Sequence, residues 1–151
     1  MALRILLEAN DTALRKKSRE VTAFDQRLHQ LLDDMHETMA NAEGVGIAAV
    51  QIGILRRVVV IDIEGRLELI NPVLTQASEE TLVVSEGCLS FLGERGMVPR
   101  PQKVTVNAFD RHGKPFTFTG EDMLARAICH ELDHLEGVTF HDRAIMMQEP
   151  D

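Results

Sequence analysis

The sequence has few cysteines, no extended hydrophobic run and no concentration of basic residues. Its two cysteines, Cys88 and Cys129, come without a secretion signal, which is typical of a protein in a reducing compartment. No segment approaches the length of a membrane span, and the short apolar run at residues 3–7 is followed at once by polar residues. We therefore predict a cytoplasmic protein with neither a signal peptide nor a membrane contact.

The charge balance is acidic, because 24 acidic and 16 basic side chains give a net charge of −8. Since no block or stripe of lysine and arginine appears, we predict no direct nucleic-acid binding, although charge alone leaves a weak, transient ribosome contact open. The 151 residues suffice for one domain with a substantial core and are too few for two. We therefore expect a single domain over residues 1–151.

Hydrophobic periodicity predicts two helices in the first third of the chain. A short one is expected within residues 11–21. A longer amphipathic helix is expected over residues 24–41, where apolar side chains recur with helical spacing. Its histidines, His29 and His36, have polar neighbours and are assigned to the solvated face.

The middle of the chain has the composition of strands, and the C-terminal part returns to a helical pattern. Strands are expected at residues 58–62, 67–70, 81–84, 103–108 and 116–118. Residues 91–101 contain two glycines and two prolines and are predicted to be a loop. Thr119 with Asp122 gives a capping signature for the last helix. This order predicts an α+β fold in which antiparallel β-sheets wrap around a central, buried C-terminal helix.

The predicted C-terminal helix contains His130-Glu131-Leu132-Asp133-His134, a His-Glu-x-x-His pattern. On a helix these two histidines leave the same face one turn apart, so both can bind one metal ion. Glu131 can reach the open position of that ion without being a ligand. This is the arrangement of metallohydrolases in which a carboxylate acts as general base toward water.

Two histidines at this spacing are often only a solvated helix face. Here Met123 and Ala127 share the face of the histidines. Apolar side chains occupy another face, namely Leu124, Ile128, Leu132 and Leu135. A helix that is apolar on two sides is buried on two sides, and buried histidines need partners. The pattern therefore favours a metal site.

A catalytic site of this kind needs a third protein ligand. Where a related motif has a third histidine this chain has Phe140, and the one glutamate further downstream, Glu149, lies near the end. Cys88 is the better candidate because a thiolate is a soft ligand, although a cysteine can equally be a small buried hydrophobe. Cys129 points about 100° away from His130 on the helical wheel and is assigned to the core.

A second stretch of interest, residues 44–53, has two glycines around one aliphatic residue, which permits close approach of its backbone to another group. One interpretation is a nucleotide-binding loop, but the third glycine of the dinucleotide pattern and a Gly-Lys-Ser/Thr sequence are missing. The other is a strand that lines an active site, with Gln51 pointing inward and needing a hydrogen-bond partner.

Three motifs in this order resemble those of the peptide deformylase family: Gly-Val-Gly-Ile-Ala-Ala-Val-Gln at residues 44–51, Glu-Gly-Cys-Leu-Ser at 86–90 and His-Glu-Leu-Asp-His at 130–134. The similarity extends over nearly the whole chain, and the ordered trio is more specific than any one motif. The chain departs from the pattern at Cys129, where the family often has glutamine. It also ends at Asp151, which leaves a ribosome contact through the C-terminal helix of some members without support.

The resemblance implies a metal-dependent hydrolase that removes the formyl group from the N-terminal formyl-methionine of newly made polypeptides and releases formate. It implies Cys88, His130 and His134 as ligands of one divalent metal ion per chain. The working metal would be Fe²⁺, with Zn²⁺, Ni²⁺ or Co²⁺ as substitutes, because the ligand set alone does not distinguish them.

The resemblance also implies roles for the neighbouring residues. Glu131 would be the general base, and the Gln51 side-chain amide and the Leu89 backbone N–H would donate to the oxyanion. The methionine side chain would need an apolar slot, and an extended peptide would need backbone partners. For this substrate site we expect Val45, Val84, Met123 and Ala127 in the slot, Arg126 at its rim and Gly46 as a backbone partner.

Two other functions are alternatives at this point. A metalloprotease would use the same His-Glu-x-x-His helix but would leave residues 44–51 and Cys88 unexplained. A metal-stabilised binding module without catalysis, for example one that recognises nascent N-termini, would have no need of Glu131.

Overall fold

The computed structural model describes residues 2–149. Its helices are η1 (Thr12–Arg15), α1 (Gln26–Asn41), η2 (Ala49–Ile52), α2 (Asp122–Leu135) and α3 (Phe140–Arg143). Its strands are β1 (Gly46–Ala48), β2 (Val58–Asp62), β3 (Arg66–Ala77), β4 (Thr81–Glu86), β5 (Gly96–Pro101), β6 (Lys103–Phe109), β7 (Pro115–Glu121) and β8 (Met146–Met147). None of the helices in this range is long and apolar enough to cross a bilayer.

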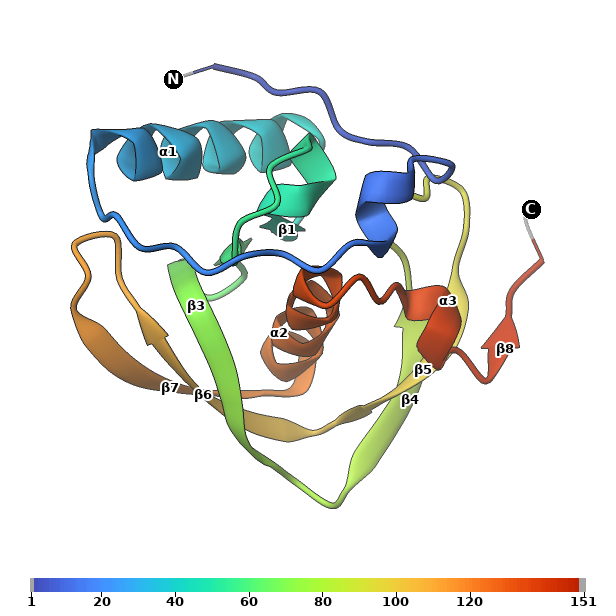
Figure 1. Ribbon diagram of the computed structural model, residues 1–151. Helices are drawn as coiled ribbons and strands as arrows, with labels where there is room; N and C mark the ends of the chain where they lie inside the picture. Colours follow the sequence, from blue (N-terminus) through green and yellow to red (C-terminus); the bar gives the residue numbers. More distant parts are fainter. Residues whose placement is uncertain (1, 150–151) are drawn as a thin grey trace.

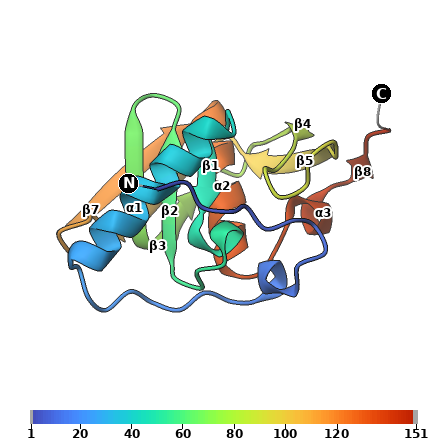
Figure 2. The same ribbon diagram turned by 90° about the horizontal axis from the view of Figure 1, so that it is seen from above.

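Two antiparallel sheets curve around helix α2 (Figure 1). The larger sheet has the order β1-β2-β3-β6-β7, and the smaller one has the order β4-β5-β8. Helix α1 packs on the opposite face of the larger sheet, as the view from above shows (Figure 2). The predicted α+β fold with sheets around a buried helix is confirmed.

Strand β2 shows how the larger sheet separates two apolar layers. Its side chains alternate in direction, so Val59 and Ile61 join the core around α2, while Val58 and Val60 join the core under α1. All four are fully buried. Being covered on both faces, β2 reads as a continuous β-branched run rather than as an alternating pattern.

Strand β3 extends beyond the predicted residues 67–70 because it bends at Asn71 instead of ending there. Asn71 has a positive φ of 50°, and the register with β6 shifts between Ile70 and Val73. The Asn71 side chain accepts from the Val21 N–H at 2.8 Å and donates to the Val21 carbonyl at 2.9 Å. The bend therefore ties the sheet to the N-terminal segment.

The prediction of a loop over residues 91–101 is wrong for its second half, which forms β5. A proline lacks the N–H group that a strand donates to its neighbour. Prolines are tolerated here because β8 pairs only with Gly96 and Met97, so the rest of β5 has no hydrogen-bonded strand on that side. Pro99 and Pro101 therefore lie in a strand whose opposite neighbour is β4 alone.

The two helix starts that were predicted from local signals also differ. Within residues 11–21 only η1 forms, because the chain then runs extended and the Ser18 N–H donates to the Leu135 carbonyl at 2.8 Å. Helix α2 begins directly after β7, with Glu121 at its N-cap and no side-chain capping bond. The capping role of Thr119 and Asp122 is therefore wrong, since Thr119 lies within β7.

The assignment of His29 and His36 to a solvated surface is wrong. His36 is 4% exposed, and its Nε2 lies 2.8 Å from the Glu68 carboxylate on β3. The half-buried His29 places its Nε2 2.8 Å from the Arg111 carbonyl. Partners on β3 and in the turn after β6 satisfy these polar groups, and such distant partners cannot be seen in the helix sequence.

Gly137 closes the C-terminal end of α2 against the N-terminal segment. Its φ is +73°, and a Cβ atom at this position would lie 2.4 Å from the Arg15 carbonyl oxygen. Both the left-handed conformation and the close approach require glycine.

We predict that Gly137→Ala lowers the free energy of unfolding by about 2–4 kcal/mol, from the positive φ and the backbone clash together. Urea denaturation measures this change. Gly53→Ala is the matched control, because Gly53 has a φ of +82° but open space around its Cβ position. Equal losses in the two variants would contradict the role of the close approach.

Candidate metal centre

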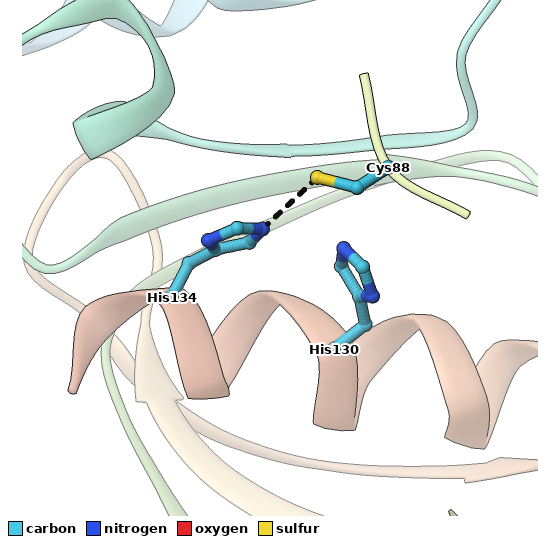
Figure 3. Close-up of side chains that lie close together, drawn as sticks. All are labelled: Cys88, His130 and His134. Carbon is cyan, nitrogen blue, oxygen red and sulfur yellow. Dashed lines mark hydrogen bonds between the residues drawn. The ribbon is translucent and has the colours of Figure 1, made fainter. Parts of the chain in front are cut away.

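Helix α2 and the segment after β4 bring three metal-ligating side chains together. His130 and His134 leave the same face of α2, and Cys88 approaches them from the opposite side (Figure 3). Their ligand atoms all lie within 4.8 Å of one another, and Cys88 Sγ is 3.3 Å from His134 Nε2. The two histidines are 7% and 1% exposed. The predicted ligands thus form one cluster, in which the two histidines are buried and Cys88 is half-buried.

The chemistry of this cluster fits a divalent transition metal. Burial lowers the pKa of His134 to about 3, so its imidazole is neutral and offers a lone pair. Burial would also lower the pKa of His130, but Cys88, Glu131 and Glu86 outweigh it and raise that pKa, because these acceptors surround the ring. One thiol and two imidazoles are ligands that transition metals prefer, and the neighbouring carboxylates attract a cation to them.

Glu131 lies beside the ligands with part of its hydrogen-bonding capacity unused. It is 4% exposed, and its Oε1 atom is buried without a partner. A Cβ atom at Gly46 would lie 2.7 Å from Glu131 Oε2, so the glycine permits β1 to pass this carboxylate closely. Burial raises the pKa of Glu131 to about 7, with the opposing charge of His130 lowering it in part. A carboxylate with such a pKa can accept and return a proton near neutral pH.

Gln51 is held in one orientation by its own turn. It lies on η2 rather than on the predicted strand. Its Oε1 accepts from the Ala48 N–H at 2.9 Å, and its Nε2 donates to Ser90 Oγ at 3.3 Å and to Cys88 Sγ at 3.5 Å. The donor end of the amide therefore faces the metal cluster, which meets the expectation that a buried glutamine must find partners.

Glu86 is the main residue that the sequence reasoning missed. Its carboxylate is 6% exposed and lies 2.6 Å from His130 Nδ1. It also accepts from Arg100 at 2.7 and 3.1 Å and from Arg126 at 3.0 Å. Burial would raise the pKa of Glu86, but the His130 and Arg100 contacts lower it to about 2. The contact at Nδ1 leaves Nε2 of His130 as the nitrogen that faces the cluster.

A groove of about 480 Å³ opens beside the metal cluster. Of the predicted site residues, it is lined by Val45, Gly46, Gln51, Cys88, Leu89, Met123, Arg126, Ala127, His130 and Glu131. Val84 is not among the lining residues, although it lies on β4 and is 44% exposed. The groove also includes residues that were not predicted, at its rim: Glu43, Leu92, Glu94 and Arg95.

Arg126 borders this groove but is committed to contacts within the protein. Its guanidinium donates to Glu86, to the Val98 carbonyl at 2.9 Å and to the Leu82 carbonyl at 2.7 Å. It therefore connects α2 with both β4 and β5.

Leu89 packs against the segment that leads into β1, where a Cβ atom at Gly44 would lie 2.6 Å from its Cδ1. The close backbone approaches predicted for the two glycines of residues 44–46 are thus present.

A His-Glu-x-x-His helix with a cysteine opposite it, and a groove beside a buried carboxylate, defines a metal-dependent hydrolase. The family is that of the polypeptide deformylases, whose family profile matches residues 3–149, and the chain belongs to this family. The resemblance seen in the sequence is thereby confirmed.

Relatives of known sequence or structure are similar to this chain over most of their length. A peptide deformylase of Caldicellulosiruptor bescii is 55% identical over 146 residues, which cover 96% of this chain and 87% of that protein. The crystal structure of a peptide deformylase from Legionella pneumophila has a TM-score of 0.91 at 43% identity, covering 94% and 86% of the two chains. A peptide deformylase from Synechococcus elongatus, in complex with actinonin, has a TM-score of 0.91 at 38% identity, covering 93% and 80%.

The raised pKa of Glu131 predicts a pH-dependent stability difference. Between its ordinary pKa of 4.5 and about 7, the folded metal-free protein binds a proton that the unfolded chain has lost. Stability therefore falls as pH rises through this window, and Glu131→Gln removes that fall. Between pH 4.5 and pH 8 we expect the free energy of unfolding of the variant to rise by up to about 3 kcal/mol relative to that of the wild type. Urea denaturation in the presence of a chelator measures the free energy of unfolding. A difference between variant and wild type that does not change with pH would refute the raised pKa of Glu131.

Proposed function

We propose that Cys88, His130 and His134 hold one Fe²⁺ ion and that the adjacent groove binds the N-terminal formyl-methionine of a newly made polypeptide. As a member of the peptide deformylase family, the protein is a hydrolase that removes the N-formyl group and releases formate. The observation that carries the assignment of residues is Glu131, whose buried carboxylate has an unpartnered oxygen and lines the groove together with Cys88 and His130.

Glu131 is proposed to move the proton in this reaction. A bound divalent ion would supply Lewis acidity toward the water and the formyl oxygen. Glu131 accepts a proton from the attacking water and gives it to the peptide nitrogen as the bond between formyl carbon and nitrogen breaks. The products are formate and a free amino terminus. The same group must act first as a base toward water and then as an acid toward the leaving nitrogen, and its buried position beside the ligands lets one carboxylate serve both steps.

Gln51 and Leu89 are proposed to stabilise the negative charge that develops on the formyl oxygen. The Gln51 amide is already oriented by Ala48 and Ser90, so its N–H group faces the cluster without reorganisation. The Leu89 backbone N–H would be the second donor, since this residue follows Cys88 directly and lines the groove. Donors that are fixed before the reaction stabilise an oxyanion most effectively.

The methionine side chain is proposed to enter the apolar part of the groove. Val45 and Met123 are 49% and 64% exposed, and with Ala127 they line its wall. A bound side chain would cover these exposed apolar surfaces, which favours binding. Gly46, on the edge strand β1, is proposed to offer backbone groups to the extended peptide.

Iron is proposed as the working metal because of the family, with Zn²⁺, Ni²⁺ or Co²⁺ as substitutes. One thiolate and two imidazoles do not by themselves distinguish these ions. We also propose that residues 1–151 form one catalytic domain that works in the cytoplasm, where thiols stay reduced, and that it meets the ribosome transiently as the source of formylated chains.

The direct test is formate release from formyl-Met-Ala-Ser by anaerobically purified protein, with elemental metal analysis of the same sample. We expect formate and about one metal ion per chain, because the ligand cluster offers a single site. Exposure of half the sample to air should reduce activity, since Fe²⁺ beside a thiolate is oxidised readily.

The matched variant is Cys88→Ala, which should lose both the metal and formate release because one of three ligands is missing. Iron bound without formate release would contradict the proposed function. Equal activity in the two halves of the sample, with iron bound in both, would contradict iron as an oxygen-sensitive working metal. A Cys88→Ala variant that keeps metal and activity would remove Cys88 from the ligand set.

A further inference from the structure

His130 is covered by a residue from beyond its own helix. Phe140, the first residue of α3, is 1% exposed, and its ring is stacked on the His130 imidazole with centroids 6.3 Å apart and planes 22° apart. Phe140 is itself fixed in an apolar cluster with Leu14, Phe91 and Val98. The ring therefore has little freedom to move aside, and α3 limits the rotation of a proposed metal ligand.

The other end of α3 reaches His130 through a line of charged hydrogen bonds. Arg143 donates to both oxygens of Asp133, through Nε and Nη2, at 3.1 Å each. Asp133 accepts from Arg100 Nη1 at 2.7 Å, and the remaining edge of Arg100 binds Glu86. Glu86 in turn contacts His130 Nδ1 at 2.6 Å. The signs of charge alternate from Arg143 through Asp133 and Arg100 to Glu86.

Asp133 and Glu86 both bind the guanidinium of Arg100, and Arg143 affects how that guanidinium is shared between them. Asp133 is only 14% exposed and Arg100 only 4%, so neither can turn to water instead. By neutralising Asp133 from outside, Arg143 leaves the Nε edge of Arg100 to Glu86. Without Arg143, a poorly solvated Asp133 carboxylate would draw Arg100 toward itself and weaken the hold on Glu86.

We propose that Arg143 and Asp133 are positioning residues for the metal centre, which act on His130 through Arg100 and Glu86. This inference rests on the proposed function, since it requires that the cluster binds an ion. It makes metal retention depend on an exposed arginine of α3 that touches neither the ligands nor the groove. Partners beyond the ligand shell orient a ligand and typically change metal affinity when they are removed.

The same turn offers a matched control. Arg15 donates through Nη1 to both oxygens of Asp142, at 3.3 and 3.0 Å, and so ties η1 to α3. The side chains of Arg15 and Arg143 are each 52% exposed. Asp142 is 47% exposed and Asp133 14%, and it is the pair of Arg143 that continues through Arg100 and Glu86 to His130.

The experiment measures the Co²⁺ dissociation constant by competition with a chromophoric chelator, for the wild type, Arg143→Gln and Arg15→Gln. We expect Arg143→Gln to weaken binding about tenfold, at the lower end of the effect of such partners, and Arg15→Gln to leave it unchanged. Arg143→Lys should restore part of the loss, because a single ammonium group neutralises Asp133 without the two-point contact. The Co²⁺ absorption spectrum should change in Arg143→Gln alone.

The double variant Asp133→Asn/Arg143→Gln should bind no more weakly than Asp133→Asn, because Arg143 acts only through Asp133. Thermal unfolding of the metal-free variants should show similar stability for Arg143→Gln and Arg15→Gln. Wild-type affinity in Arg143→Gln would overturn the inference, and so would an equal loss of affinity in Arg15→Gln. A wild type that binds no ion would overturn the proposed function itself, a result distinguishable from the other two.

Discussion

The rest of the site depends on the hydrogen bonds and ion pairs of the buried Glu86 carboxylate. It joins the end of β4 to Arg100 of β5 and to Arg126 and His130 of α2, so the smaller sheet and the central helix share one buried charge. Arg100 is 4% exposed, and without Glu86 the Nε edge of its buried guanidinium would lose its partner, leaving only Asp133. The same buried carboxylate therefore holds the smaller sheet against α2 and orients the proposed metal ligand His130.

The buried carboxylates beside the ligand cluster differ in whether they have hydrogen-bond partners. Glu86 is buried and accepts from Arg100 and Arg126, whereas Glu131 keeps one buried carboxylate oxygen without a partner beside the ligand cluster. Because Cys88 and the glycines of residues 44–46 also belong to this place, a metalloprotease that leaves them without a role does not account for it. A binding module without catalysis leaves the buried Glu131 carboxylate, with an unpartnered oxygen beside the ligand cluster, without a role.

Local sequence signals predicted most of the elements and the residues of the Cys88, His130 and His134 cluster, but not the contacts between distant segments. The helical period around His130 and the β-branched run at β2 depend on neighbouring residues, and both predictions agree with the structure. Strand β5, the burial of His36 and the network around Glu86 depend on partners many residues away. Val84 illustrates the same limit, since its proximity to Cys88 in the sequence did not bring it into the groove.

The most direct test of the central claim, that Glu131 acts on a metal held by its neighbours, is a paired measurement on Glu131→Gln. Metal content and formate release from formyl-Met-Ala-Ser are determined on the same anaerobic sample. The account predicts about one metal ion per chain, as in the wild type, and at least a ~100-fold loss of formate release, the usual scale of general acid–base catalysis. Unchanged turnover with the metal retained would contradict it.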